Sequence, residues 1–417
     1  MPHYYIWTIG CQMNKAESER LGSLFEQHGY QATTTAEEAD IIVLNSCVVR
    51  QSAEDRVTNK LDNLQVLKKQ RPGLTLALTG CLVDSNTAQL SKAFPYVDHF
   101  FKPGEPPVWL EKVGESRPLA QDAPPAVYLP IIQGCDNFCS YCIVPYRRGR
   151  ERSRPVAELA AEARDLVRRG AREITLVGQN VDSYGHDFPG KPDLADLLTE
   201  LNGVEGLARL RFLTNHPKDM TTRLIEAIAS LDKVCQQFNL PVQSGDNDIL
   251  KLMRRGYSVE HYRQLIAEAR RRIPGVSIST DVIVGFPSES ERQFQRTLDL
   301  LAELRFETVH VAAYSPRPGT IAARELEDNV PAPEKSRRLN LIEHLQENIS
   351  SEINATLLGE TVEILVEGRK KGKWLGRTRS GKLVFFTDNS NCRGRLVNIK
   401  IEKAGAWSLQ GSLESSK

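Results

Sequence analysis

Three closely spaced cysteines give the chain a candidate metal site. Cys135, Cys139 and Cys142 stand at a C-x3-C-x2-C spacing, with an apolar, strand-like stretch before them and several arginines after them. Thiolates bind zinc and iron-sulfur clusters, and three of them are one ligand short of a closed zinc site or a fully ligated 4Fe-4S cube. A 4Fe-4S cluster held here would keep one iron open for a substrate, so the spacing indicates chemistry more than structure.

Zinc is the structural alternative for this loop. Zinc sites usually combine two pairs of cysteines or add histidine, and the next histidines along the chain are the distant His186 and His216. A ferredoxin-type site would need a fourth nearby cysteine. Cys235 and Cys392 each stand alone, so we assign both to structural roles. A cluster with an open iron fits the spacing best.

The composition limits the class of protein. A chain of 417 residues is long enough for about two to four domains of roughly 100–200 residues, and a monomer of this size can bury its own cores. The net charge is +1, so any affinity for nucleic acid must come from local clusters of Lys and Arg. We expect a monomer.

The N-terminal sequence and the cysteine content indicate a compartment. The first five residues lead directly into a strand pattern unlike a signal peptide, and no apolar run approaches the roughly 18 residues that a membrane span needs. We expect a cytoplasmic protein without a membrane partner. In a reducing compartment the eight cysteines are poor candidates for disulfides, so clustered ones are expected to bind metal or act in catalysis.

Three further cysteines occupy equivalent places near the N-terminus. Strands are predicted over 3–9, 41–44 and 74–78, and a helix over 14–28. Cys11, Cys47 and Cys81 each follow one of these strands. Parallel strands joined by helices end at one edge of a sheet, so the three thiols can converge. A single cysteine is usually a small buried residue, but three in equivalent places favour ligation.

A proline-rich linker over 103–126 separates this α/β domain from a longer array. Six strand-like segments alternate there with helical patterns, which predicts a partial parallel (βα)6 barrel with its active site at the carboxyl ends of the strands. The segments are 127–132, 173–177, 210–213, 238–242, 276–284 and 308–313. Polar stretches follow each of them, and any one of these stretches alone is an ordinary turn.

The C-terminal segment predicts a small antiparallel β-barrel after a long helix over 334–358. Its short strands alternate apolar and polar residues, and basic residues lie close to Trp374, Phe385 and Phe386. The basic residues are Arg369, Lys370, Lys371, Lys373, Arg377, Arg379 and Lys382. Cations beside aromatic rings suit RNA, and a solvated charged face is the equally open alternative.

The cysteine motif with Tyr141 before its third Cys resembles the signature of the radical SAM superfamily. The resemblance implies a 4Fe-4S cluster on Cys135, Cys139 and Cys142 whose open iron binds S-adenosylmethionine (SAM), which the reduced cluster splits to a 5′-deoxyadenosyl radical. A low-potential donor such as flavodoxin or ferredoxin would supply the electron. Amides that follow predicted strands, Gln179, Asn180 and Gln243, are the candidate SAM contacts, with turn stabilisation as the alternative.

Further motifs narrow the resemblance to the methylthiotransferases. The stretches 10–14, 45–47 and 80–81 are similar to their N-terminal domain, and 360–413 is similar to their TRAM domain. The Cys-Gln-Met-Asn stretch and, imperfectly, 49–53 resemble the MiaB-type tRNA enzymes. Two departures are Asn239, where many relatives carry His, and Ser288, where Gly is usual. The expected domains are 1–102, 127–355 and a TRAM RNA-binding domain over 356–417.

The resemblance implies methylthiolation at C2 of N6-(dimethylallyl)adenosine at tRNA position 37. Cys11, Cys47 and Cys81 would hold an auxiliary 4Fe-4S cluster that carries the sulfur, and two SAM molecules would be used per product. A side-chain base near neutral pH cannot remove an aromatic C2 proton, whereas a radical route can. The base must reach the barrel mouth, which an anticodon stem-loop permits because its bases can splay out.

The role of one group of arginines and two rival functions stay open. The arginines at 147, 148, 150, 152 and 154 are either phosphate contacts or a solvated loop. One rival is a metal-binding RNA-binding protein without catalysis. The other is a methylthiotransferase that acts on threonylcarbamoyladenosine or on a ribosomal-protein aspartate.

Overall fold

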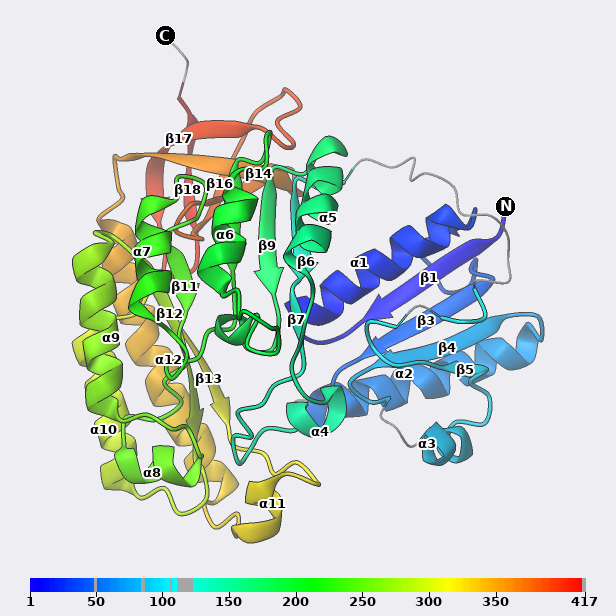
Figure 1. Cartoon of the computed structure of the whole chain (residues 1–417), viewed down its shortest axis with the longest axis horizontal. Helices are drawn as coiled ribbons and strands as arrows, with labels where there is room; N and C mark the ends of the chain where they lie inside the picture. Colours follow the sequence, from blue (N-terminus) through cyan, green and yellow to red (C-terminus); the bar gives the residue numbers. More distant parts are fainter. Residues whose placement is uncertain (49–50, 84–86, 106, 111–122, 415–417) are drawn as a thin grey trace. The chain divides into compact units, whose positions relative to one another are not determined.

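The computed structural model describes residues 1–48, 51–83, 87–105, 107–110 and 123–414 (Figure 1). Most of the predicted linker over 103–126, and residues 49–50 of the motif after Cys47, lie outside the described residues. The chain divides into two compact units. Unit 1 comprises Met1–Gln121, Gln133–Glu151 and Arg317–Thr320, and unit 2 comprises Asp122–Ile132, Arg152–Pro316 and Ile321–Lys417. The loop with Cys135, Cys139 and Cys142 therefore belongs to the same unit as the N-terminal sheet.

Unit 1 is built on a parallel sheet in the order β2-β1-β3-β4-β5. Its strands are β1 (His3–Thr8), β2 (Gln31–Ala32), β3 (Ile41–Ser46), β4 (Thr75–Gly80) and β5 (His99–Phe100). Its helices are α1 (Gln12–Gln27), α2 (Gln51–Gln70), α3 (Thr87–Ala93) and α4 (Val144–Arg148). The predicted parallel α/β domain is confirmed.

Alternation along the central strand β3 explains why helices cover both faces of this sheet. Ile42 and Leu44 pack into a core with Leu61 of α2, whereas Val43 packs on the opposite face with Phe25 of α1. Successive side chains of a strand point to opposite faces, so an unbroken apolar run needs a cover on each side. All six residues of β3 are buried.

Unit 2 contains two three-stranded parallel sheets, β10-β9-β6 and β11-β12-β13. An isolated bridge between Leu210 and Val234 connects the strand β10 to the segment before β11. The strands are β6 (Ala126–Pro130), β9 (Glu173–Val177), β10 (Arg209–Phe212), β11 (Gln237–Asn239), β12 (Ser277–Val284) and β13 (Thr308–Ala313). This arrangement confirms the predicted partial barrel of six strands.

Helices flank these strands and shield their apolar core (Figure 1). They are α5 (Val156–Arg168), α6 (Leu194–Asn202), α7 (Thr222–Ser230), α8 (Asn247–Leu252), α9 (Val259–Arg272), α10 (Glu291–Leu304), α11 (Ile321–Glu325) and α12 (Ala332–Ala355). Short elements are the 3-10 helix η2 (Val181–Ser183) and the strands β7 (Ile132–Gln133) and β8 (Arg152–Ser153). No helix in the described part of the chain has the length and apolar character of a membrane span.

A closed five-stranded barrel completes unit 2, in the order β14-β15-β16-β18-β17. Its strands are β14 (Thr361–Lys370), β15 (Lys373–Thr378), β16 (Leu383–Phe386), β17 (Leu396–Ala404) and β18 (Leu409–Leu413). Neighbours pair antiparallel except β16 and β18, which pair parallel. Closure leaves no free sheet edge, and the predicted small β-barrel is confirmed.

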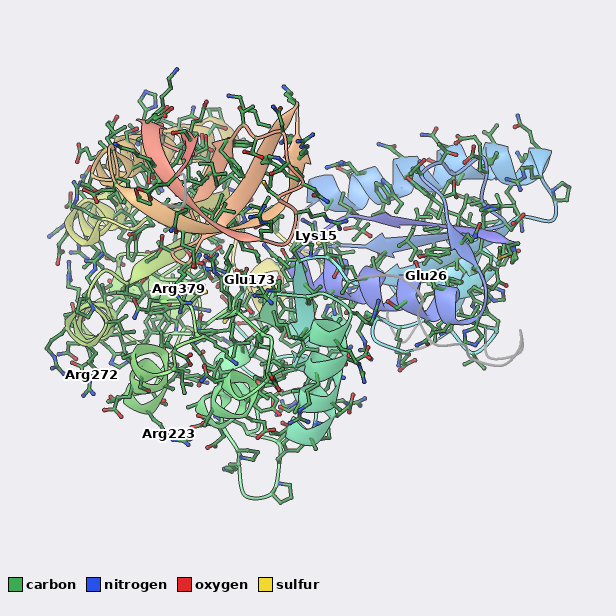
Figure 2. The ribbon with its side chains drawn as sticks, turned by 90° about the horizontal axis from the view of Figure 1, so that it is seen from above. Lys15, Glu26, Glu173, Arg223, Arg272 and Arg379 are labelled. Atoms are coloured by element: carbon green, nitrogen blue, oxygen red, sulfur yellow. The ribbon has the colours of Figure 1, made fainter. Side chains whose placement is uncertain are left out.

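Buried arginines attach this barrel to the amino-terminal ends of β9 and β10. Arg211 donates to the Glu173 carboxylate at 2.8 Å and to the backbone oxygens of Thr378 and Arg379 at 2.6 and 2.7 Å. Arg209, also fully buried, donates to the Arg377 carbonyl at 2.7 Å. Figure 2 shows Glu173 and Arg379 beneath the barrel. Carbonyl and carboxylate oxygens accept from both guanidinium groups, although Arg209 Nε is left without a partner. The carboxyl ends of the strands stay clear of the barrel.

Candidate functional site

The three N-terminal cysteine loops meet at the carboxyl edge of the unit 1 sheet. Asn14, fully buried near the start of α1, donates to Asn45 Oδ1 and to the Ser46 carbonyl, both at 2.9 Å. Asn45 donates back to the Asn14 carbonyl at 2.8 Å. The backbone N–H of Cys81 bonds to the same Ser46 carbonyl at 2.8 Å. These bonds hold together the loops that carry Cys11, Cys47 and Cys81.

Asn14 and Asn45 are positioning residues whose role sequence reasoning did not assign. They lie within the Cys-Gln-Met-Asn and Asn-Ser-Cys motifs, three residues after Cys11 and two before Cys47. The signal was present in the motifs themselves, because an amide that follows or ends a buried strand needs partners for its donors and acceptor. Arg317 is a third unassigned residue: it donates to the carbonyl of Val48, next to Cys47, at 2.5 Å.

The cysteines differ in exposure around this edge. Cys11 is exposed, whereas Cys47 and Cys81 are 6% and 4% exposed. Burial raises the pKa of the Cys81 thiol, Arg148 opposes that shift, and Cys11 is near enough to add to it. Two buried thiols and one accessible thiol thus lie at one edge of the sheet, with sulfur as the shared donor type.

Gly80, directly before Cys81, lies close against the backbone of Ser46. Gly80 has φ 93°, and a Cβ there would lie 2.3 Å from the Ser46 carbonyl oxygen. Only glycine allows the β4 chain to turn this tightly against the Cys47 loop. The approach of Gly80 to Ser46 therefore sets the separation of two of the three cysteines.

The second cysteine loop folds back on itself within the same unit. Gly134 has φ 83°, and its missing Cβ leaves room for the Arg150 carbonyl oxygen, which would otherwise lie 2.1 Å away. Cys135 N–H bonds to the Gly149 carbonyl at 3.2 Å, and Cys142 N–H bonds to the Cys139 carbonyl at 3.0 Å. The segment after the helix α4 thereby closes the loop that displays the three thiols.

Arg148, the last residue of α4, joins this loop to the N-terminal cysteines. Its Nε donates to Cys81 Sγ at 3.2 Å, and its Nη1 and Nη2 donate to Glu17 at 2.5 and 3.1 Å. Burial lowers the pKa of Arg148, but the nearby Cys81 and Glu17 outweigh it and the pKa is raised. The guanidinium therefore stays charged in a buried position.

Two of the five arginines predicted as phosphate contacts are occupied inside the protein. Arg148 is buried as described, and Arg154 donates to Glu158 at 3.0 Å and to the Pro130 carbonyl at 2.8 Å. Arg150 is exposed and pairs with Asp136 at 2.9 Å. Neither the phosphate nor the solvated-loop interpretation holds for Arg148 and Arg154.

The two cysteine groups share one type of donor atom. Within the described ranges, no three His, Cys, Asp or Glu side chains lie close enough together to bind one metal ion. The cysteines of an iron-sulfur cube each bind a different iron, so they stand farther apart than the ligands of one zinc ion. Each group offers three thiols and no histidine, which is the type of donor that a 4Fe-4S cube takes.

Unit 2 presents a separate group of polar side chains at the carboxyl ends of its strands. Asn180, Asn215, His216 and Gln243 are buried, and each has one side-chain polar atom without a hydrogen-bond partner. The atoms are Asn180 Oδ1, Asn215 Oδ1, His216 Nε2 and Gln243 Oε1. An unpaired buried polar atom costs about 1–3 kcal/mol, and these four atoms lie in the segments that follow β9, β10 and β11.

The carboxylates of Asp182 and Asp219 accept hydrogen bonds from the members of this group that follow β9 and β10. Asn180 donates to Asp219 at 2.7 Å, and Asp182 accepts from Asn215 and from the His216 backbone N–H. Gln243 follows β11 and accepts a backbone bond from Ile283 of β12 at 3.0 Å. The neighbouring Gln179 is half-buried. Asn215 and His216 belong to a polar stretch predicted from the sequence, but their unpaired atoms depend on tertiary packing.

Burial sets the protonation of two groups here. It raises the pKa of Asp182 to about 7, and it lowers the pKa of His216 to about 2, helped by the positive charges of Arg255 and Lys218. A neutral imidazole results, although His216 Nδ1 lies 3.9 Å from Asp219. Because Nδ1 accepts from the Lys218 N–H at 3.2 Å, the ring proton is on Nε2. His216 therefore offers a hydrogen-bond donor.

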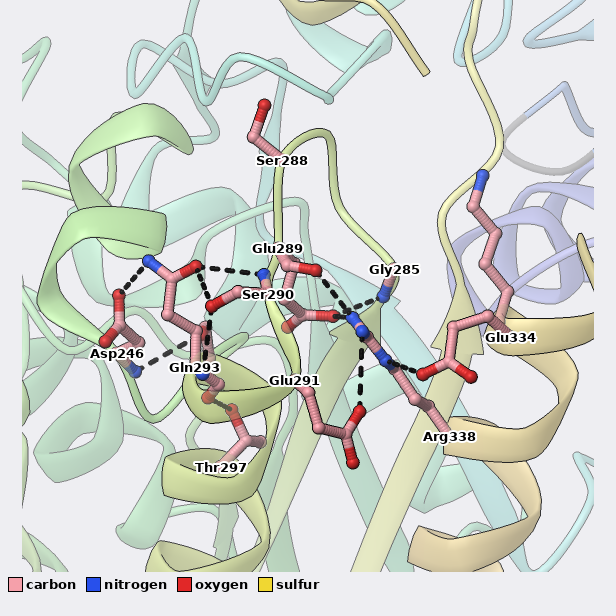
Figure 3. Close-up of polar contacts among 12 residues, drawn as sticks. Asp246, Gly285, Ser288, Glu289, Ser290, Glu291, Gln293, Thr297, Glu334 and Arg338 are labelled. Atoms are coloured by element: carbon pink, nitrogen blue, oxygen red, sulfur yellow. Dashed lines mark hydrogen bonds and ion pairs between the residues drawn. The ribbon is translucent and has the colours of Figure 1, made fainter. Parts of the chain in front are cut away.

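A carboxylate shapes the loop after β12 (Figure 3). Glu289 accepts from the Gly285 N–H at 2.6 Å and from Arg338 Nη1 at 2.8 Å. Burial raises the pKa of Glu289, against the opposing effect of these two donors. The capping box of Ser290 and Gln293 starts α10 directly afterwards. The loop is thus fixed at both ends.

The two departures from the family pattern both have local explanations. Ser288 has φ 67°, in the left-handed region that glycine adopts at lower cost, and Asn329 Oδ1 accepts from its N–H at 2.8 Å. Asn239 donates to Asp281 at 2.9 Å and to Ser279 at 3.2 Å. Neither departure disturbs a cysteine.

Family models and solved structures define the class of protein. The models described as Radical SAM superfamily, Uncharacterized protein family UPF0004 and TRAM domain match residues 129–301, 3–102 and 355–413. The radical S-adenosylmethionine methyltransferase TsrM of Kitasatospora setae shares the fold, with a TM-score of 0.55 and 13% identity over 78% of this chain and 74% of that chain. The cobalamin-dependent enzyme OxsB gives a TM-score of 0.52 and 14% identity over 83% of this chain and 56% of that chain. The fold is that of a radical SAM protein.

Full-length relatives narrow the class to one family. A protein of Dehalococcoides mccartyi (strain 195) is 54% identical over 99% of each chain. Proteins of Roseiflexus sp. (strain RS-1) and Chloroflexus aurantiacus are 50% and 49% identical and cover 99% and 98% of this chain, and 90% and 91% of their own. All three are named tRNA-2-methylthio-N(6)-dimethylallyladenosine synthase. The chain belongs to this family, which confirms the predicted relationship.

Replacing Gly80 with alanine is expected to destabilise unit 1. The positive φ alone costs about 1–3 kcal/mol for a side chain, and the contact with Ser46 adds to it. Gly29→Ala is the matched control, because Gly29 has φ 83° and nothing within 4 Å of its added Cβ. Calorimetry of the metal-free protein should show a larger fall in Tm for Gly80→Ala. Equal falls would show that the contact with Ser46 contributes nothing.

Asp182→Asn is expected to change the pH dependence of stability. The folded-state pKa of about 7 lies above the ordinary value of 3.8, so the native state holds a proton that the unfolded chain has released, and wild-type stability falls as pH rises towards and through 7. The free energy of unfolding of the wild type minus that of Asp182→Asn should therefore decrease from about pH 5 to about pH 8. Urea titrations measure it, with the exposed Asp299→Asn as the charge control. A pH-independent difference would contradict the raised pKa.

Proposed function

We propose that this chain is a radical SAM methylthiotransferase that converts N6-(dimethylallyl)adenosine at tRNA position 37 to its 2-methylthio derivative. The observation that carries the proposal is the grouping of six cysteines, from four separate segments, within one compact unit of a chain that matches named synthases from end to end. A structural metal site would not need two groups of three thiols with open positions.

Each group of cysteines is assigned a cofactor. Cys135, Cys139 and Cys142 would hold the 4Fe-4S cluster that binds SAM, and Cys11, Cys47 and Cys81 would hold the auxiliary 4Fe-4S cluster. When bound, these groups supply the radical and sulfur chemistry that replaces the C2 hydrogen with a methylthio group. Asn14 and Asn45 hold the loops of Cys11 and Cys47 together by their mutual hydrogen bonds.

The amides of unit 2 are proposed SAM contacts. Asn180 and Gln243 each present a buried amide oxygen that lacks a partner, which suits the amine or ribose hydroxyls of SAM. Gln179 lies beside Asn180 and is assigned to the same site. His216 Nε2, as a neutral donor, suits an acceptor such as the carboxylate. Asp182 and Asp219 orient these side chains and do not need to touch the ligand.

The RNA surface of the barrel is proposed to be the β14–β15 hairpin. Of the seven basic residues predicted there, Arg379 donates to the Asp232 carbonyl at 2.7 Å and Lys382 donates to Asn354 at 2.8 Å, so both serve contacts with the rest of unit 2. Arg369, Lys370, Lys371 and Lys373 are exposed around the hairpin turn. Arg369 lies 4.2 Å from the Trp374 ring centroid. Such cations suit the phosphates of an anticodon stem-loop.

The remaining assignments are proposals of the same kind. The family models support an N-terminal domain near 1–102, a radical SAM core within 127–355 and a TRAM domain near 356–417. We assign a low-potential electron donor such as flavodoxin or ferredoxin to the reaction, and a monomer as the active form.

Nucleoside analysis tests the function directly. A bacterial strain whose own synthase gene is deleted should regain 2-methylthio-N6-dimethylallyladenosine when it expresses this chain. Mass spectrometry of digested tRNA measures the product. The chain would have one of the rival functions if the strain instead gained 2-methylthio-threonylcarbamoyladenosine, or a methylthiolated ribosomal aspartate, without the dimethylallyl product.

Cysteine variants in the same strain separate the two clusters. Cys139→Ala should lose both SAM cleavage and product, whereas Cys47→Ala should keep some cleavage of SAM to deoxyadenosine and lose sulfur insertion. Cys235→Ala is the control, since Cys235 is buried in unit 2 whereas the six cysteines of the two groups belong to unit 1. Methylthiolated tRNA from Cys47→Ala would refute the auxiliary-cluster assignment.

Neutralising the hairpin should weaken tRNA binding in a salt-dependent way. For Lys370→Gln/Lys371→Gln, the slope of log K against log salt concentration should shrink by up to about 0.7–0.9 for each lost phosphate contact. Lys400→Gln/Lys403→Gln removes the same charge from the exposed side of β17 and is the control. Fluorescence anisotropy with an anticodon stem-loop measures both. Equal losses in the two variants would indicate a general charge effect.

A further inference from the structure

Arg148 places a buried cation against one of the six cysteines. Its side chain is 2% exposed and that of its partner Glu17 is 8% exposed. The guanidinium fork holds both carboxylate oxygens of Glu17, which leaves Nε–H directed at Cys81 Sγ, 3.2 Å away. This geometry is specific to arginine, whose planar group can serve a carboxylate and a third acceptor together.

The position of Arg148 in the chain connects both cysteine groups. It ends α4, which begins two residues after Cys142, while Glu17 lies in α1, whose N-cap is Cys11. One side chain therefore joins the loop of Cys135, Cys139 and Cys142 to Cys81 and to the helix that starts at Cys11. All these segments belong to unit 1.

Two buried charges of opposite sign face the Cys81 sulfur from this pair. A hydrogen bond from a cation to a cluster sulfur stabilises the more negative, reduced form, and hydrogen bonds to the sulfurs are among the protein's means of setting a cluster potential. The Glu17 carboxylate acts in the opposite direction because its negative charge disfavours reduction nearby. The two residues therefore have separable, opposite electrostatic effects.

We propose that Arg148 is a positioning residue for the auxiliary cluster, which fixes Cys81 as a ligand and raises the reduction potential of the cluster through its Nε–H···Sγ hydrogen bond, with Glu17 moderating the effect. The proposal rests on the proposed function, because Cys81 must ligate that cluster. A purely structural ion pair would fix the loop without setting the potential.

The test uses the full chain with Cys135, Cys139 and Cys142 changed to alanine, so that any cluster is held by the other three cysteines. After anaerobic reconstitution, iron and sulfide content and the midpoint potential are measured in this parent and in its Arg148→Met and Glu17→Gln derivatives. Arg148→Met should lower the midpoint potential and Glu17→Gln should raise it. Arg150→Met is the matched control, since Arg150 has a side chain 69% exposed and should leave the potential unchanged.

The outcomes separate this proposal from the assignment on which it rests. A parent chain that binds no iron refutes the auxiliary cluster itself. A parent that binds iron, with Arg148→Met unchanged in potential, overturns the role of Arg148. If the midpoint potential shifts in the same direction in Arg148→Met and Glu17→Gln, the ion pair is only a structural contact. The proposed electrostatic effect on the potential is then overturned.

Arg148→Lys and hydrogen exchange test the role of Arg148 if Arg148→Met does not retain a cluster. Loss of iron from Arg148→Met supports the positioning role, and Arg148→Lys, which keeps the charge but has no fork, should then hold iron with a potential below that of the parent. Hydrogen exchange in the metal-free chain gives an independent measure: the amides of Gly80, Cys81 and Leu82 should exchange faster in Arg148→Met. Unchanged exchange at these amides would overturn the positioning role.

Discussion

Parallel strand pairing is the constraint on which both candidate sites depend. In unit 1 the strands β1, β3 and β4 run in one direction, so the residues that follow them, among them Cys11, Cys47 and Cys81, emerge at one edge. In unit 2 the same geometry gathers the loops after β9, β10 and β11. Backbone hydrogen bonds fix these directions regardless of the side chains that will do chemistry.

Buried polar side chains differ in how completely they are hydrogen-bonded. The buried Arg211 and the amides Asn14 and Asn45 find partners within their own unit, whereas Glu173 keeps one unpaired carboxylate oxygen. Asn180 and Gln243, equally buried, each keep an unpaired oxygen. A buried polar atom that lacks a partner lowers the stability of the fold. The unpaired oxygens of Asn180 and Gln243 lie after β9 and β11 and suit the proposed ligand, whereas that of Glu173 lies at the first residue of β9.

Basic residues that lie close together in the sequence differ in burial, and therefore in what their charge can bind. Arg148 and Arg150 lie two residues apart, yet one is buried against a thiol and a carboxylate and the other is exposed beside Asp136. On the barrel, Arg379 binds backbone oxygens of unit 2 while Lys370 and Lys371 are exposed at the hairpin turn. A count of basic residues therefore overestimates the surface available to RNA.

The sequence by itself determined the elements and the chemical types. Apolar periodicity located the strands and helices to within a few residues, because backbone geometry imposes periods of 2 and 3.6 on any buried face. The short spacing of Cys135, Cys139 and Cys142 indicated that they bind one metal site together, because residues so near in the chain cannot lie far apart. The motif resemblance supplied the family. Each of these signals is local in the chain.

Only the tertiary structure decided which distant groups meet. The bonds of Asn14 with Asn45, the contact of Arg148 with Cys81 and the docking of Arg379 and Lys382 all join segments far apart in the sequence. A guanidinium or an amide has the same composition whether it is buried or exposed, so its role depends on the partners that packing brings to it. For that reason the six cysteines could be recognised as candidates from the sequence, whereas the residues that hold and tune them could not.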